Sequence, residues 1–106
     1  LYAKYSSDLD VLIETGEAFF ASSSRDHQVK AGEIFNTIIT GVPPENNVYP
    51  STWWNAWMRR MQIMDKLSDQ TSDISLRVRQ LEAIDAQLGG EPYRSELKRL
   101  ALKHSR

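Results

Sequence analysis

The feature that most constrains this chain is a stretch of 37 residues, 52–88, that contains neither glycine nor proline. Such a stretch can be helical throughout, because glycine and proline are the residues that most often end a helix. One helix of this length would be about 55 Å long, which is more than a compact domain of this size can contain. The short polar residues SDQTSD, 68–73, favour a turn, because their side chains compete for backbone hydrogen bonds. We therefore expect an antiparallel helical hairpin of residues 52–67 and 73–88, with a single long helix as the alternative.

The two halves of this stretch have matching apolar patterns. A turn centred near Thr71 sets apolar residues opposite one another at each step of the hairpin. The expected pairs are Leu67 with Ile74, Met64 with Val78, Met61 with Leu81, and Trp57 with Ile84. Two long helices that cross in a symmetric dimer would form the same pairs, so the pattern predicts the contact and not which chain supplies it.

Residues 1–21 have the pattern of an amphipathic helix, because apolar side chains recur three or four positions apart. Ser6 or Ser7 could instead cap a helix that begins there, which would leave the first residues as a separate turn. Gly16 lies within the apolar stripe, where glycine costs roughly 1 kcal/mol relative to alanine. We interpret Gly16 as a packing notch that admits another helix or a large side chain.

Two further helices are indicated by their end signals. Ser24 is a good cap for a helix that ends near Thr40, because a glycine and then two prolines follow. The loop GVPPENNVYP, 41–50, is long enough to cross one end of a bundle. Pro92 is suited to the first turn of a final helix. Together these elements predict an all-α fold, a four- or five-helix bundle without strands.

The composition is that of an ordinary globular domain, with 41% hydrophobic and 25% charged residues among 106. We expect a single helical domain over residues 1–106, and because the chain begins with leucine we interpret it as a fragment of a larger protein. The absence of cysteine excludes disulfides and thiolate metal sites, and is in keeping with an intracellular protein of the cytoplasm or nucleus. No apolar run approaches the ~20 residues of a membrane span, so no membrane association is expected.

The sequence STWWNAWMRRMQIM, residues 51–64, carries three tryptophans and three methionines beside an arginine pair. On a helical wheel the apolar residues of 53–67 form two adjoining stripes that cover more than half of the circumference. The first stripe consists of Trp53, Trp57, Met64 and Leu67, and the second of Trp54, Met58 and Met61. One neighbouring helix cannot cover both. Either this helix is central in the bundle with neighbours on both sides, or the second stripe binds a partner.

Residue types in the second stripe are suited to binding, since tryptophan and arginine are enriched at binding hot spots and methionine adapts to varied contacts. An uncovered patch containing Trp54 would approach the largest apolar patches that monomers expose. We therefore predict a non-catalytic protein–protein interaction module, an adaptor or oligomerisation domain. Its expected contact surface consists of Trp54, Met58, Met61 and Arg59. The expected partner supplies an amphipathic helix or an apolar peptide, or is a second copy of this chain.

Residues 91–106 are basic, with five cations against two carboxylates and a local charge of +3. As the alternative function we consider a nucleic-acid-binding domain with a basic face of Arg94, Lys98, Arg99, Lys103 and Arg106. The overall net charge of −1 provides no global field that would gather nucleic acid. The first helix is acidic, and the opposite charges of the two helices would also help them to lie in one bundle.

Residues suited to catalysis or metal binding are few. His27 and His104 have no acidic or metal-binding residue three or four positions away, as a two-ligand helical site requires. The serines of ASSSR, 21–25, lack an identifiable base. We therefore expect no enzymatic activity, no cofactor and no metal.

Arg60 and Asp85 are the two ionic residues that fall inside apolar stripes of the expected hairpin. The hairpin would bring them within about one helical turn of each other. They either reach water at the edge of the stripe, or form a partly buried ion pair that fixes the register of the helices.

Overall fold

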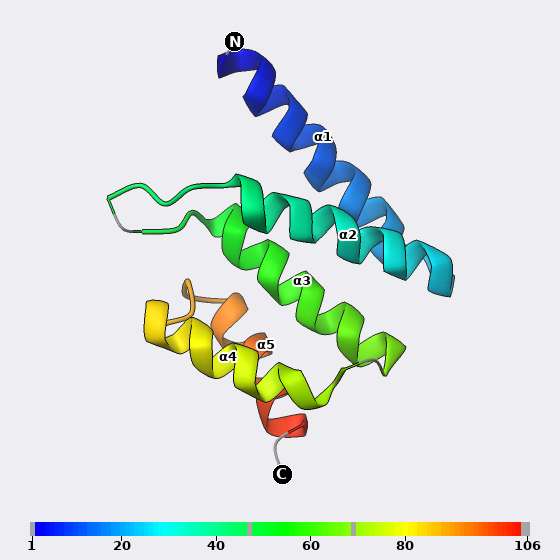
Figure 1. Ribbon diagram of the computed structural model, residues 1–106, viewed down its shortest axis with the longest axis vertical. Helices are drawn as coiled ribbons and strands as arrows, with labels where there is room; N and C mark the ends of the chain where they lie inside the picture. Colours follow the sequence, from blue (N-terminus) through cyan, green and yellow to red (C-terminus); the bar gives the residue numbers. More distant parts are fainter. Residues whose placement is uncertain (1, 47, 69, 105–106) are drawn as a thin grey trace.

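The computed structural model describes residues 2–46, 48–68 and 70–104, with the side chains of the first helix described from Leu9 onward. Over these residues the chain forms five helices and no strand (Figure 1). The helices are α1 (Tyr2–Ala21), α2 (Arg25–Gly41), α3 (Ser51–Leu67), α4 (Ser72–Ile84) and α5 (Tyr93–Lys103). The predicted all-α fold is confirmed.

The five helices form a flat molecule. Its principal extents are 47 × 36 × 19 Å, so it is less than two helix diameters thick in its shortest direction. In Figure 1, α1, α2, α3 and α4 follow one another down the plane of the view, and α5 lies behind α4. The amino-terminal half of α1 extends beyond α2 at one end of the molecule. The middle position belongs to α3.

Two hydrophobic clusters lie on different sides of α3. The larger, which we call the tryptophan cluster, joins α3 to α4 and α5. Its buried members are Trp53, Trp54, Trp57, Met58, Met61, Ile74, Val78, Leu81, Leu88, Leu97 and Leu100. The smaller, which we call the Phe35 cluster, joins α3 to α2 and α1. Its buried members are Ala31, Phe35, Ile38, Ala56 and Ile63. Because α3 contributes to both clusters, it is the central helix, as one of the two sequence interpretations expected.

The helix ends agree with most of the sequence signals. Ser24 caps α2, and its hydroxyl accepts a hydrogen bond from the backbone N–H of His27 at 3.4 Å. The same helix ends at Gly41, two residues before Pro43. α1 is one continuous helix from Tyr2, so the alternative start near the serines of its second turn is wrong.

α3 and α4 form the predicted antiparallel hairpin rather than one long helix. Ser68 ends α3 in the left-handed conformation, with φ of 52°, and α4 begins at Ser72. α5 packs closely against both helices and thereby closes the hairpin (Figure 1).

The expected hairpin pairs are supported only in part. The outermost pair is wrong, because Ile84 is 52% exposed while Trp57 is buried. Leu67 packs against the Phe35 cluster, whereas Ile74 belongs to the tryptophan cluster. Met61, Val78 and Leu81 are buried in the tryptophan cluster, and Met64 packs against it. α3 and α4 make few direct contacts and are joined mainly through α5, so the pairing of these residues stays a prediction.

Arg60 and Asp85 do not pair with each other in the described structure. The carboxylate of Asp85 accepts hydrogen bonds from the backbone N–H groups of Gln87 at 2.9 Å and Gly89 at 3.2 Å. The guanidinium of Arg60 lies over the ring of Trp57, 5.3 Å from its centroid. The hypothesis of a buried ion pair is therefore wrong, and Asp85 instead shapes the connection from α4 to α5.

Gly16 is the packing notch that the sequence indicated. A Cβ atom at this position would lie 3.1 Å from Cγ2 of Ile34 and 3.1 Å from Cζ of Phe35. Such contacts are tighter than ordinary van der Waals contacts, and Phe35 is completely buried. The missing side chain therefore lets α1 approach α2.

A second close approach occurs where the connection to α5 crosses the tryptophan cluster. Gly89 has φ of +81°, and a Cβ atom there would overlap the Trp54 indole, only 2.5 Å from its Cδ1 atom. Gly90 has nearly the same conformation, with φ of +85°, but a Cβ atom there would meet nothing within 4 Å. The two glycines therefore form a matched pair that differs in this one contact.

We expect Gly89→Ala to lower the free energy of unfolding by about 3 kcal/mol or more, because left-handed strain is added to a clash with a buried ring. Gly90→Ala should cost about 1 to 2 kcal/mol, from strain alone. Urea unfolding followed by circular dichroism measures both losses. Equal losses would contradict the close packing of Gly89 on Trp54.

Candidate functional site

The aromatic stripe predicted to bind a partner is buried inside the chain's own fold. Trp54, Met58 and Met61 are 2%, 7% and 1% exposed. All three belong to the tryptophan cluster, as do the tryptophans of the other stripe. Side chains covered to this degree offer no open surface to a partner in this arrangement. The second covered side of α3 is formed by Ala56 and Ile63, which the helical wheel did not single out.

Arg59, the polar member of the predicted contact surface, is engaged with α1. Its Nε atom donates to Oε2 of Glu17 at 2.9 Å, and its guanidinium lies 4.4 Å from the centre of the Phe20 ring. Arg59 also donates to Oε1 of Gln62 at 2.8 Å, and Gln62 donates to Glu96 of α5 at 2.8 Å. These hydrogen bonds join α1, α3 and α5 along the polar side of α3.

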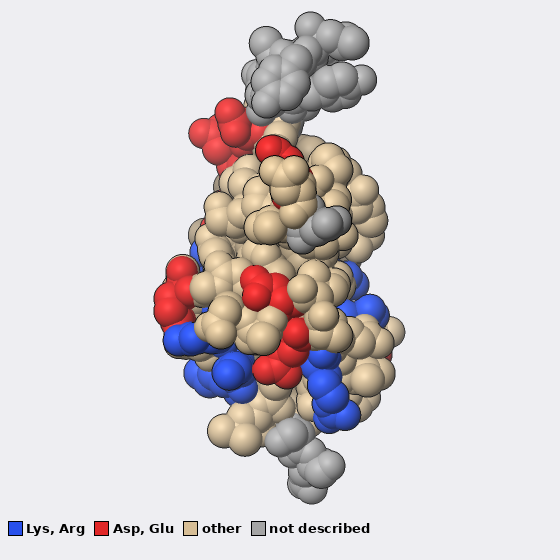
Figure 2. Space-filling model, turned by 90° about the vertical axis from the view of Figure 1, so that its left-hand side faces the viewer, with Lys and Arg blue, Asp and Glu red and all other residues tan. Residues whose placement is uncertain are grey.

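Most described cations of the predicted basic face are paired with carboxylates. Lys98 is exposed, while Arg106 lies outside the described residues. The ion pairs are Arg94 with Glu91 at 3.0 Å, Arg99 with Glu96 at 2.7 Å, and Lys103 with Asp65 at 2.9 Å. On the face shown in Figure 2, basic and acidic side chains are interspersed rather than separated into fields. A phosphate would have to compete with these carboxylates, so no observation favours nucleic-acid binding.

Asp65, near the end of α3, holds the end of α5. Its Oδ1 atom lies 2.9 Å from Nζ of Lys103 and 2.7 Å from Nε2 of His104. Burial by itself would raise the pKa of Asp65, but the hydrogen bonds and charges of these two neighbours outweigh it, and the pKa is lowered. Glu96 and Arg99 are the other charged groups that interact with Asp65.

A carboxylate whose pKa is lower in the folded than in the unfolded chain stabilises the fold above the unfolded pKa, about 3.9 for aspartate. This stabilisation is lost as pH falls through the folded pKa. We therefore expect Asp65→Asn to reduce the free energy of unfolding by about 1 to 2 kcal/mol at neutral pH.

The difference in the free energy of unfolding between wild type and Asp65→Asn should decrease once the pH falls below about 4. Urea unfolding at a series of pH values measures it, with Asp10→Asn, an exposed position on α1, as the control. A difference that stays constant down to the acid limit would contradict the assigned role of Asp65.

The burial of the tryptophans can be measured in solution. Trp53, Trp54 and Trp57 are 5%, 2% and 8% exposed, and Nε1 of Trp53 donates to the backbone oxygen of Ile39 at 3.1 Å. We expect blue-shifted fluorescence and little quenching by iodide in the native protein, and full quenching after unfolding in guanidinium. Efficient quenching of the native protein would mean that the aromatic stripe is open, as the partner hypothesis required.

One serine lies beside a potential base, contrary to the sequence expectation. Nδ1 of His27 is 2.7 Å from Oγ of Ser22, and the same Oγ accepts a hydrogen bond from the backbone N–H of Ser24 at 3.1 Å. Within the described residues no carboxylate bonds to His27, so nothing orients the imidazole as in a catalytic triad. The contact organises the tight connection between α1 and α2. No group of acidic and histidine side chains in the described part of the chain could hold a metal ion.

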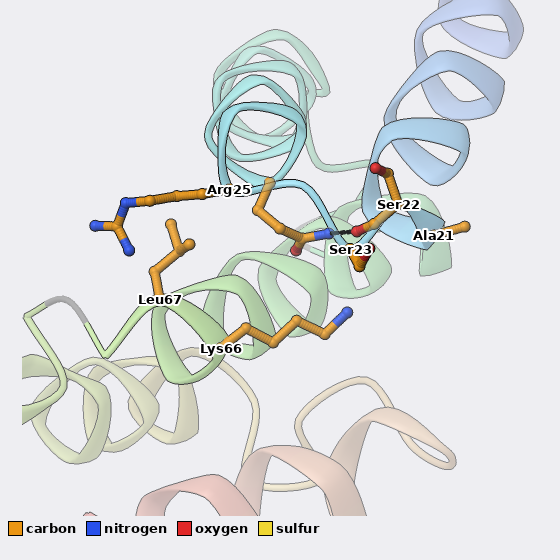
Figure 3. A pocket seen from close by; sticks show the side chains of 7 residues that line it. Ala21, Ser22, Ser23, Arg25, Lys66 and Leu67 are labelled. Atoms are coloured by element: carbon orange, nitrogen blue, oxygen red, sulfur yellow. Dashed lines mark hydrogen bonds between the residues drawn. The ribbon is translucent and has the colours of Figure 1, made fainter.

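A cleft opens where the end of α1, the start of α2 and the end of α3 meet (Figure 3). Figure 3 shows Arg25 and Lys66 extending in opposite directions, with Leu67 on the side of Arg25 and Ser22 and Ala21 across from it. The cleft has a volume of about 430 Å³ and is lined by Ala21, Ser22, Ser23, Arg25, Gln28, Lys66 and Leu67. Sequence reasoning missed this site, because its residues come from three helices and each one alone is an ordinary residue near a helix end.

Gln28 is the buried polar residue of this cleft, with 3% of its surface exposed. Its Nε2 atom donates to the backbone oxygens of Ser22 at 2.6 Å, Phe20 at 2.7 Å and Phe19 at 3.4 Å. These bonds fix the orientation of the carboxamide, because turning it over would set its oxygen against carbonyl oxygens. The remaining atom, Oε1, is buried and has no hydrogen-bond partner among the described residues.

No helix in the described part of the chain is long and apolar enough to cross a membrane. No family model, curated protein or solved structure matches the chain. The function therefore has to be inferred from its own residues.

Proposed function

We propose that this chain is a non-catalytic protein–protein interaction module, and that its partner supplies a helix that lies along α1. The observation that carries this proposal is the incomplete burial of α1. Within residues 9–21, no apolar side chain is fully buried. The residues left half-buried against the Phe35 cluster are Leu9, Leu12, Ile13, Phe19 and Phe20. Each of the other four helices contributes fully buried apolar side chains.

The incomplete burial has a geometric cause. α1 packs along α2 and reaches α3 near its own carboxyl-terminal end, where Glu17 and Phe20 contact Arg59. Its amino-terminal half extends beyond α2 (Figure 1), while the apolar pattern of the sequence continues into that half. Covering apolar surface with a second helix is favourable by roughly 25 cal/mol per Å². A partner helix can therefore add burial along α1.

A shallow hollow between α1 and the start of α2 provides an anchor point for such a partner. It has a volume of about 480 Å³ and is lined by Glu14, Thr15, Ala18, Phe19, Ser22 and His27. Val11, one turn earlier on the same side of the helix, is 57% exposed. A large apolar side chain seated in such a hollow is the usual form of a binding hot spot.

The charge of α1 indicates which kind of helix would fit. Asp10 and Glu14 are exposed on it, and Lys4 is its single basic residue. An amphipathic helix with basic flanks would cover the apolar stripe and lie beside these carboxylates. A second copy of the chain could offer α5, but most described cations there are already paired. This favours a different protein as the partner.

Synthetic helices of defined pattern test the proposal. An amphipathic leucine–lysine peptide should bind at physiological ionic strength, and a leucine–glutamate peptide of the same pattern should not. Ala18→Arg should weaken binding about tenfold or more, because it places bulk and positive charge in the hollow. Ala83→Arg on α4 is the matched control, since both alanines are exposed on helices. Fluorescence anisotropy measures the affinities.

Hydrogen exchange locates the contact. The α1 amides should exchange faster than those of α3 in the isolated chain and gain protection when the basic peptide binds. Light scattering tests whether the partner is a second copy of the chain. A dimer that becomes monomeric on Ala18→Arg would support the second copy rather than a different protein. A monomer whose α1 gains no protection from either peptide would overturn the proposal.

A further inference from the structure

We propose that the cleft between α1, α2 and α3 binds the carboxyl-terminal residue of a peptide chain, through its carboxylate and its last backbone N–H. The proposal rests on the proposed function in that the ligand is part of a protein partner. It concerns a different surface, however, because Arg25, Gln28 and Lys66 carry it rather than the outer side of α1.

Oε1 of Gln28 is a buried acceptor without a hydrogen-bond donor among the residues that the structure describes. A buried acceptor without a donor is uncommon in native proteins, because the atom has lost its hydrogen bonds to water. Since Nε2 is turned toward the carbonyl groups at the end of α1, Oε1 faces away from them. A ligand that brings an N–H or O–H group would satisfy this oxygen. An ion that only accepts hydrogen bonds, such as sulfate, would be repelled by it.

The cleft is positively charged, because Arg25 and Lys66 line it. Within the described part of the chain, neither Arg25 nor Lys66 forms an ion pair with a carboxylate. The ammonium of Lys66 is held 3.7 Å from the centre of the Phe20 ring and 3.5 Å from the Phe20 backbone oxygen. Arg25 is the first residue of α2 and is exposed, so its guanidinium can turn toward a ligand. The positive end of the α2 dipole favours negative charge at the same place.

A ligand suited to this cleft carries both a hydrogen-bond donor and a negative charge. The last residue of a peptide carries both, since a single Cα atom joins its backbone N–H to its carboxylate. Leu67 and Ala21 provide apolar contact for its side chain. The volume, about 430 Å³, is near the lower end of ligand sites, which favours a short chain end over a long segment.

Three short peptides, each titrated into the intact protein, test the carboxylate and the backbone N–H separately. One has a free carboxylate, the second a carboxyl-terminal amide, and the third a free carboxylate but an N-methylated last residue. Nuclear magnetic resonance titration follows the Gln28 side-chain amide and the backbone amides of Ser23 and Arg25. We expect the first peptide to bind, and the other two to bind about tenfold more weakly, because each lacks one charge-assisted or buried hydrogen bond. Sulfate at equal ionic strength should not displace the first peptide.

Matched variants complete the test. Arg25→Gln should weaken binding of the free-carboxylate peptide about tenfold, as should Lys66→Gln. Lys30→Gln, an equal change of charge on an exposed residue of α2 outside the cleft, should not affect it. Gln28 itself is less suited to substitution, because it also holds the end of α1.

Three results would overturn the proposal: equal affinity for the acid and the amide, binding unaffected by Arg25→Gln, or no shift at millimolar peptide. The titration needs no helical partner. A failure of helix binding at α1 therefore leaves the result for the cleft intact, and a failure at the cleft leaves the result for α1 intact.

Discussion

α3 has to bury apolar side chains on two sides, and the positions of the other helices follow from that requirement. Its tryptophan side is covered by α4, α5 and the connection between them, and its Ala56 and Ile63 side by α2. The remaining arc of the helix is polar, and there Arg59 and Gln62 bond to α1 and α5. With layers on two sides only, the molecule is flat, and α1 is the outermost helix with one close helical neighbour (Figure 1).

Both proposals concern what this packing leaves incomplete. At the end of the molecule near α5, most described charged groups have partners. Its cations form ion pairs with carboxylates, and Asp65 binds two residues at the end of α5. At the other end, α1 retains a half-covered apolar stripe, and the junction of α1 with α2 retains an unpaired oxygen on Gln28. A surface that still has free energy to gain from contact is where a partner is expected to bind.

The fold could be predicted to the extent that it depends on local signals. Apolar periodicity predicted the helices. The Ser24 cap and Gly41 predicted the ends of α2, and the polar run near residue 70 predicted the turn of the hairpin. The site could not be predicted, because a helical wheel gives the direction of a side chain and not what lies against it. In the sequence, Gln28 is an ordinary polar residue in the first turn of a helix. Its Oε1 atom loses access to hydrogen-bond donors only because the folded chain places the end of α1 beside it.

The sequence by itself determined that this chain is helical, where its helices run, and that its third helix needs more than one neighbour. Only the tertiary structure decided that Trp54 lies inside and that α1 remains half open. The physical reason is that burial depends on contacts between distant segments. Gly89 lets the connection before α5 pass directly over the Trp54 ring, while Gly16 brings α2 against α1 and nothing in the described chain covers the other side of α1.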